Sequence, residues 1–208
     1  MATKKLTNLL ILLLIFSNSL IAKEWNFDAV LNDRVIGQHI FKVENFKSLS
    51  KANFHIEFLF MDIYYKHVSN ESWSNGCLSK IDSKTDDDGD FFKVKGQLEE
   101  KQFELKANKN SFQYPACLMT FAYWDPNILK QSKLLNSQDG ELLDINVEFI
   151  ADELMVIRQE KIITKHYQLV ASKDDNEKLK IQLWYDKEMN WVGLSSTTPI
   201  GDIFYKLL

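Results

Sequence analysis

The sequence predicts a mainly β fold, either an antiparallel barrel or a strongly curved sheet of about ten or more strands, with one short helix at about residues 126–135. Three observations support this prediction. Apolar and polar residues alternate with a period of two along most of the chain, as they do in half-buried strands. Short polar turns rich in Asn, Asp and Gly separate these runs. A helical start signal occurs in one place, so strands dominate.

The strands follow from the alternation. Residues 24–31 and 35–43 form a predicted hairpin around Asn32 and Asp33. Residues 52–68 are expected to form one long third strand, which is apolar on both faces over its second half and therefore central in a sandwich or next to an apolar cavity. Further strands are predicted within residues 71–84, 91–98, 101–107, 142–150, 153–159, 161–171, 179–186, 191–197 and 202–208.

The stretch PACLMTFAYWDP, residues 115–126, leads into the predicted helix. Residues 117–123 are expected to be a strand. Asp125 can then cap the helix, because its carboxylate accepts hydrogen bonds from the free amides of the first turn. Pro126 suits the first helical position, and apolar residues recur at helical spacing from Ile128 to Leu135. We expect this helix to lie across one mouth or face of the sheet.

The first 22 residues carry the pattern of a secretory signal peptide. Lys4 and Lys5 precede an apolar run from Leu9 to Phe16, and the small residue Ala22 ends the segment. The run is shorter than the roughly 20 apolar residues that cross a bilayer. We therefore expect cleavage after Ala22 and no transmembrane segment after signal cleavage, with an uncleaved anchor helix as the alternative.

The composition argues against several classes of protein. Without Lys4 and Lys5 the formal net charge changes from −4 to −6, which is opposite to the basic patch that nucleic-acid binding needs. Gly (7) and Pro (3) are too scarce for a linker, so a single β-rich domain over residues 23–208 is expected. We predict no nucleic-acid partner, and the sequence identifies no protein partner.

Cys77 and Cys117 are the two cysteines of the chain. In an oxidising compartment paired thiols normally form a disulfide, so we expect a bridge between them. A reactive thiol that acts as a nucleophile is the alternative, and it requires one cysteine to stay reduced.

No metal site and no cofactor is predicted. The acidic stretch TDDDGD, residues 85–90, lacks the EF-hand spacing, because Gly89 is fourth rather than sixth when Asp86 is counted first. A solvated hairpin turn is expected there instead. His55 and Glu57 share a strand face and are expected to make a surface contact. No Ser or Cys has the local sequence frame of a known nucleophile motif.

A group of aromatic residues is the main candidate for a binding site. Such side chains either fill a β core or line a cavity for an apolar or lipid-like ligand, and composition leaves both readings open. The candidate lining residues are Trp73, Phe121, Tyr123, Trp124, Trp184 and Trp191.

Three segments resemble a family of exported proteins from Gram-negative bacteria that is known only as a domain of unknown function. They are ESWSNGCLSKIDSKTDDDGD, PACLMTFAYWDPNILKQSKLLNSQDGE and LWYDKEMNWVGLSSTT, and the core CLMTFAYWDP is the most specific part. The resemblance covers most of the mature chain. It implies a periplasmic location and both cysteines, and it implies no catalytic residues. More distantly, the expected architecture is similar to the curved sheets of periplasmic lipoprotein carriers, which hold acyl chains on a concave apolar face.

These observations lead to one functional expectation and two alternatives. The expectation is a non-enzymatic periplasmic protein that binds a lipid or other apolar molecule, with residues 117–135 forming one wall. The first alternative is an envelope enzyme acting on a glycan or lipid through acids such as Asp125, Asp86 or Glu71, which requires two carboxyl groups to converge. The second is a module that binds a protein partner through an exposed apolar patch or sheet edge.

Overall fold

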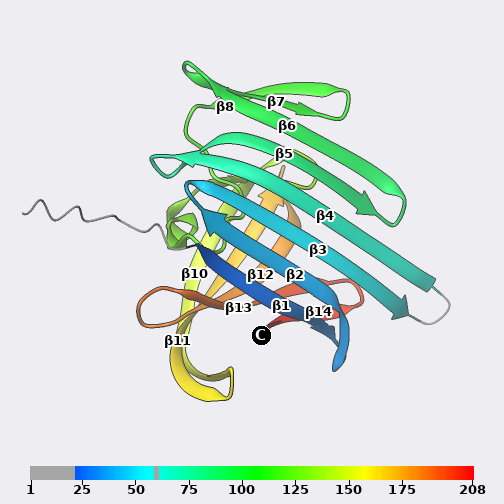
Figure 1. Ribbon diagram of the computed structural model, residues 1–208, viewed down its shortest axis with the longest axis vertical. Helices are drawn as coiled ribbons and strands as arrows, with labels where there is room; N and C mark the ends of the chain where they lie inside the picture. The colour runs from blue at the N-terminus through cyan, green and yellow to red at the C-terminus, as the bar shows by residue number, and fades with distance from the viewer. Residues whose placement is uncertain (1–21, 59–60) are drawn as a thin grey trace, which may run out of the picture.

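The computed structural model describes residues 22–58 and 61–208. Apart from Ala22, the predicted signal peptide lies outside the described residues. The described chain forms one antiparallel sheet of 14 strands, which is strongly curved and not closed (Figure 1). The predicted fold class is therefore confirmed, in its curved-sheet form. None of the helices in the described ranges is long and apolar enough to cross a membrane.

The strands and the single helical turn follow each other along the chain. They are β1 (Lys23–Leu31), β2 (Arg34–Glu44), β3 (Lys47–Phe58), β4 (Met61–Ser74), β5 (Cys77–Asp87), β6 (Asp90–Glu99), β7 (Gln102–Ala107), β8 (Asn110–Pro115), the 3₁₀ helix η1 (Pro126–Lys130), β9 (Lys133–Leu135), β10 (Leu142–Ile157), β11 (Glu160–Lys173), β12 (Asn176–Tyr185), β13 (Trp191–Thr198) and β14 (Gly201–Leu207).

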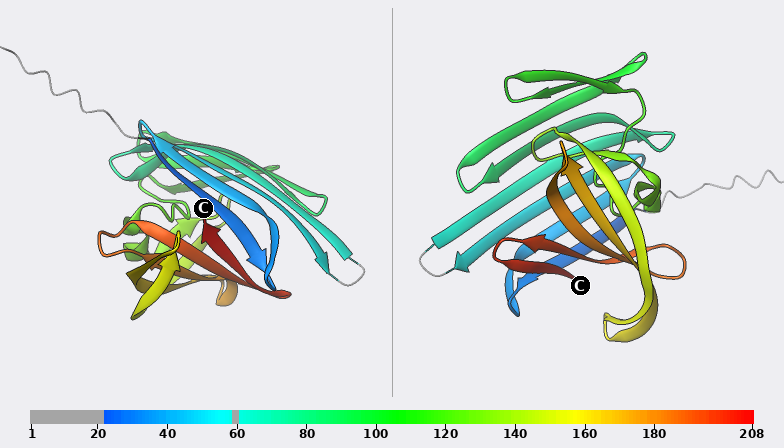
Figure 2. Two further views of the ribbon diagram at one scale, coloured as in Figure 1. Left: turned by 60° about the horizontal axis from the view of Figure 1, so that its bottom comes forward. Right: turned by 180° about the vertical axis from the view of Figure 1, so that it is seen from behind.

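The sheet consists of two meanders that are joined by the pairing of β1 with β14. Its strand order is β8-β7-β6-β5-β4-β3-β2-β1-β14-β13-β12-β11-β10-β9, so β1 and β14 pair at the centre and β8 and β9 are the edges. Figure 2 shows the second meander, β9–β14, folded beneath the concave side of the first, β1–β8. The core and the cavity described below lie between these two halves.

Tight turns with positive φ connect most neighbouring strands. Both central residues have positive φ in the turns Asn32–Asp33, Asn45–Phe46, Arg158–Gln159 and Asp174–Asp175. Two-residue turns of this kind match the right-handed twist of the strands that they connect. They explain how so long a chain forms an almost continuous meander.

The single strand expected over residues 52–68 is wrong. The chain reverses within this range, because Phe58 pairs with Met61 and β3 and β4 run antiparallel from that point. Residues 59 and 60 lie outside the described residues. The sequence FHIEFLFMDIYY has none of the Gly, Asn or Pro that usually mark a turn, so its alternation appeared continuous.

The helix expected at about residues 126–135 is much shorter. Only Pro126–Lys130 is helical, and it is a 3₁₀ turn in which the Gln131 amide donates to the Ile128 carbonyl oxygen at 3.1 Å. Residues 133–135 form β9 instead, where Leu135 pairs with Leu142. Burial in the core as an edge strand outweighs the helical spacing of these residues.

The connection from β8 to β9, residues 116–132, passes from one edge of the sheet to the other, and we call it the crossing segment. The strand expected over residues 117–123 is also wrong, since this part is irregular and makes only an isolated bridge between Thr120 and Leu135. Its backbone is tied to both halves, because Leu78 N donates to Leu118 O and Leu135 N donates to Met119 O. The crossing segment is therefore packed inside the fold.

Candidate functional site

A cavity of about 340 Å³ lies between the two halves of the sheet. One wall comes from β2–β5, the opposite wall from β12–β14, and the crossing segment and residues 136–138 border the space between them. This volume lies within the roughly 300–1,000 Å³ of typical small-molecule sites. A larger hollow of about 720 Å³ outside β5–β8 is bordered mainly by charged and polar side chains, so it is a weaker candidate.

Three of the six aromatic residues predicted to line a cavity do so. Phe121, Tyr123 and Trp124 of the crossing segment border it. Trp191 and Trp73 are buried behind the crossing segment. The ring centroid of Trp191 lies 5.5 Å from that of Tyr123, and the ring centroids of Trp73 and Trp124 lie 5.3 Å apart in an edge-to-face arrangement. Three members of the predicted group therefore border the cavity, and two lie in the core behind it.

Trp184 lies on the opposite face of the sheet. Its indole Nε1 donates to Glu153 Oε2 at 3.0 Å, and its ring stacks on His166 at 4.6 Å. His166 in turn contacts Glu153 Oε1 and Gln182 Oε1, both at 2.7 Å. These groups form hydrogen bonds with one another on the outer face of the sheet, and none of them borders the cavity.

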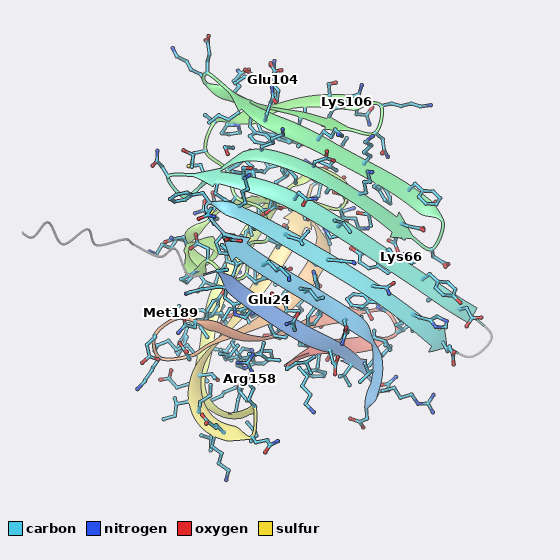
Figure 3. All side chains as sticks on the ribbon, viewed as in Figure 1. Glu24, Lys66, Glu104, Lys106, Arg158 and Met189 are labelled. Atoms are coloured by element: carbon cyan, nitrogen blue, oxygen red, sulfur yellow. A yellow bond between two sulfur atoms is a disulfide. The ribbon has the colours of Figure 1, made fainter. Side chains whose placement is uncertain are left out.

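Polar residues form a stripe on the concave face of the first half. In β4 every second residue from Tyr65 to Glu71 points inward, while Lys66 between them points outward, as do Glu104 and Lys106 of β7 (Figure 3). The inward side chains of the neighbouring strands continue this pattern. We call these residues the polar stripe: His39, Ser48, Ser50, His67, Ser69, Glu71, Ser83 and Thr85.

Glu71 is the buried acid of the polar stripe. Its Oε2 accepts from Ser48 Oγ at 3.1 Å and from Thr120 Oγ1 at 3.2 Å, and its Oε1 accepts from Ser69 Oγ at 3.0 Å. Burial raises the pKa of Glu71, and the three hydroxyl donors oppose that rise. Since Thr120 belongs to the crossing segment, Glu71 also fixes that segment against β4.

Two histidines of the polar stripe are neutral near pH 7. His67 Nδ1 lies 2.9 Å from Thr85 Oγ1 and its Nε2 lies 3.3 Å from Ser137 Oγ, and burial lowers the pKa of His67 to about 4. His39 Nε2 lies 2.7 Å from Ser50 Oγ, and burial lowers the pKa of His39 well below its usual value. The stripe therefore presents hydrogen-bonding groups without positive charge.

The carboxyl groups of the site do not converge. Asp87 also borders the cavity and its pKa is raised by burial, but it pairs with Tyr65, six positions along β4 from Glu71. Six residues of extended strand span roughly 20 Å, whereas the carboxyl pairs of glycoside hydrolases lie roughly 5–10 Å apart. Asp86 accepts from Gly89 N at 3.0 Å in the hairpin turn expected for TDDDGD.

Asp125 caps the 3₁₀ turn as predicted, because its Oδ1 accepts from Asn127 N at 2.9 Å. This observation explains why an acid follows Trp124 directly.

His55 and Glu57 form a surface contact that also includes Asp62, which the sequence reasoning missed. Potential ligand atoms of the three side chains lie within 4.8 Å of one another, and all three residues are exposed near the end of the β3–β4 hairpin. His55 also stacks on Tyr64 at 4.4 Å. Asp62 was missed because residues 52–68 read as one strand, which hides the cross-strand neighbour.

Cys77 and Cys117 form the predicted disulfide, with their Cα atoms 5.0 Å apart. The bridge links the start of β5 to the crossing segment, next to the hydrogen bond between Leu78 and Leu118. Both sulfur atoms are therefore structural, and the described residues hold no free cysteine.

A family model for a domain of unknown function, DUF6134, matches residues 27–208. This chain belongs to that family. The predicted membership of a family known only as a domain of unknown function is thereby confirmed, while export is a separate question. No curated protein matches the sequence.

The DUF6134 fold is similar to that of a crystal structure described as a β-barrel-like protein of the domain of unknown function DUF1849 from Brucella abortus. The TM-score is 0.68 at 9% sequence identity, and the match covers 91% of this chain and 96% of that chain. At this identity the likeness concerns the fold alone.

The polar stripe was not predicted from the sequence, although a signal for it exists. In YKHVSNESW the residues Tyr65, His67, Ser69 and Glu71 occupy alternate positions, where an apolar face would be usual. A polar set at period two in a hairpin indicates an inward hydrogen-bonding surface only when the facing elements are known.

Proposed function

We propose that this protein is exported to the periplasm and binds a lipid or other apolar small molecule, without catalysis, in the cavity between the two halves of the sheet. The observation that carries the proposal is the cavity itself, whose aromatic and aliphatic lining comes from elements far apart in the sequence. Such pockets, mostly apolar with a few placed polar groups, are typical of small-molecule sites.

Two features support export. The first 22 residues have the order of a signal peptide, with basic, apolar and small residues in turn. The disulfide between Cys77 and Cys117 suits an oxidising compartment, because cytoplasmic thiols are kept reduced.

The carboxyl groups favour binding over catalysis. Glu71 accepts hydrogen bonds from three hydroxyl groups, and Asp87 lies too far along the sheet to act with it on one bond. Asp125 is occupied as a cap. These carboxyl groups therefore do not form the acid and base pair that the enzyme alternative requires.

Native mass spectrometry of the protein purified gently from the periplasm tests the proposal. We expect a bound species of defined mass, and lipid extraction of the same sample should recover a compound of that mass. Ser196 borders the cavity, so Ser196→Trp should fill it and remove the bound species. Thr197→Trp is the matched control, because Thr197 is exposed on the same strand and its substitution should leave the bound species in place.

The proposal fails if the wild-type protein carries no such species and takes up none from added lipid. It also fails if Ser196→Trp, folded to the same degree as Thr197→Trp, retains the bound species unchanged.

A further inference from the structure

Charge is nearly absent from the cavity. None of the described residues that border it is Lys or Arg, and its acids are Glu71 and Asp87. Glu71 is enclosed by hydroxyl donors, and Asp87 Oδ2 accepts from Gln138 Nε2 at 3.1 Å. A ligand with a carboxylate or phosphate would lose its hydration here without meeting a cation, which is costly.

Three tyrosines, Tyr65, Tyr123 and Tyr205, are among the residues that border the cavity. Tyr65 donates to Gln138 Oε1 at 3.2 Å, and the Tyr205 hydroxyl lies 3.4 Å from His39 Nδ1. Burial raises the pKa of Tyr205 and of Tyr123, and the Tyr65 and Tyr205 hydroxyls add to the rise at Tyr123. These phenols are therefore neutral hydrogen-bonding groups that face a common space.

Tyr123 contributes a hydroxyl group that the described residues do not engage. This hydroxyl takes part in no hydrogen bond with residues 22–58 or 61–208, yet no fully enclosed side-chain oxygen of these residues lacks a partner. Tyr123 borders the cavity, and its side chain is partly exposed. A ligand oxygen in the cavity can therefore accept a hydrogen bond from this hydroxyl in place of water.

We infer that the cavity selects an uncharged amphipathic ligand, a long-chain alcohol or ester, whose oxygen bonds to the Tyr123 hydroxyl while its chain lies among the apolar side chains. This inference rests on the proposed function, because it names the ligand class for the same cavity. Aliphatic side chains of both walls, such as Ile56 and Ile203, provide the surface for the chain.

The test compares three probes of equal chain length at pH 8: dodecane, 1-dodecanol and dodecanoate. Each competes with the neutral dye N-phenyl-1-naphthylamine, whose fluorescence reports binding to the full mature chain. We expect 1-dodecanol to bind about two- to tenfold more tightly than dodecane, as one hydrogen bond allows. Dodecanoate should bind at least about a hundredfold more weakly than 1-dodecanol, because its charge finds no cation.

Tyr123→Phe should remove the advantage of 1-dodecanol over dodecane and leave dodecane binding unchanged. Tyr64→Phe is the control, because Tyr64 lies on the other face of β4 and is 47% exposed. If the Tyr123 variant does not fold, the ranking of the three probes on the wild-type protein decides.

The possible failures are distinguishable. If none of the neutral compounds binds, the proposed function itself is contradicted. Binding of all three probes with equal affinity, or tightest binding of dodecanoate, overturns only the inferred ligand class. An unchanged preference for 1-dodecanol in a folded Tyr123→Phe variant overturns the role of Tyr123.

Discussion

His67 shows how single residues of the polar stripe are kept neutral. Its imidazole is 5% exposed and lies between Thr85 and Ser137, so ionisation would place a charge in a poorly hydrated space. Glu71 is held in place by three hydroxyl groups that donate to its carboxyl group. Groups of this kind let the concave face carry hydrogen bonds next to an apolar cavity.

Burial of His67 gives folding a defined pH dependence. Its pKa is about 4 in the folded protein against an ordinary 6.5, so the unfolded chain binds the proton first. The free energy of unfolding therefore has its full value above pH 6.5. It falls by about 3 kcal/mol in total as the pH decreases toward 4. Denaturant unfolding between pH 7 and pH 4 should show this loss in the wild type. His67→Gln should lack the contribution of His67 and keep that of buried His39.

His55→Gln is the matched control for the substitution, because His55 is exposed and lies in the same β3–β4 hairpin as His67. Parallel profiles for the wild type and His67→Gln would contradict the burial of a neutral imidazole.

Asp125 offers a second prediction for a single residue. Because its side chain caps the 3₁₀ turn, Asp125→Ala should lower the free energy of unfolding by about 1 kcal/mol, and Asp125→Asn should retain most of it. Ligand binding should be unchanged in both variants, as native mass spectrometry can measure. Equal damage from Asn and Ala would show that the charge, and not the cap, is what matters.

The cap and the cysteine pair were predictable from the sequence because each depends on a local or compositional rule. Asp125 precedes Pro126 at a helical start, and two cysteines can form only one intramolecular pair. The hydrogen bonds of Glu71 were not predictable, since Ser48, Ser69 and Thr120 reach it from three different segments.

At the scale of elements, the crossing segment decides how the fold is assembled. It connects the two edge strands through the interior, and the disulfide anchors its start to β5. Strands with clear turns, such as β1 and β2 around Asn32 and Asp33, were predicted with nearly correct bounds. The crossing segment was not, because its conformation is set by contacts with both halves and not by its own periodicity.

Removal of the disulfide should destabilise the protein strongly. The bridge closes a loop with a sequence separation of 40, and chain entropy predicts a loss of about 4 kcal/mol without it. For a domain of this size that corresponds to a fall in Tm of roughly 10 °C. Calorimetry of Cys117→Ser under oxidising conditions measures the effect.

The double variant Cys77→Ser with Cys117→Ser serves as control and should melt at a similar temperature, as should the wild type with reductant. A single variant that melts together with the oxidised wild type would show that the bridge adds nothing to stability.

At the scale of the whole molecule, the cavity exists because the two meanders face each other across one bent sheet. The sequence predicted a barrel or a curved sheet without deciding between them, since both have the same alternation and turns. Closure depends on how the edges β8 and β9 end, and β9 has only three residues. Whether aromatic residues line or fill the interior likewise depends on the separation of the halves, which local patterns do not encode.

Fluorescence quenching by 12-bromododecanol tests the central claim most directly, because bromine quenches tryptophan on contact. Trp124 borders the cavity, whereas Trp184 lies on the opposite face of the sheet. We predict saturable quenching of the wild type. Trp124→Phe should lose the largest share of the quenched tryptophan emission, and Trp184→Phe should leave the quenched emission unchanged. Quenching that does not saturate, or that disappears with Trp184→Phe and persists with Trp124→Phe, would contradict ligand binding between the two halves.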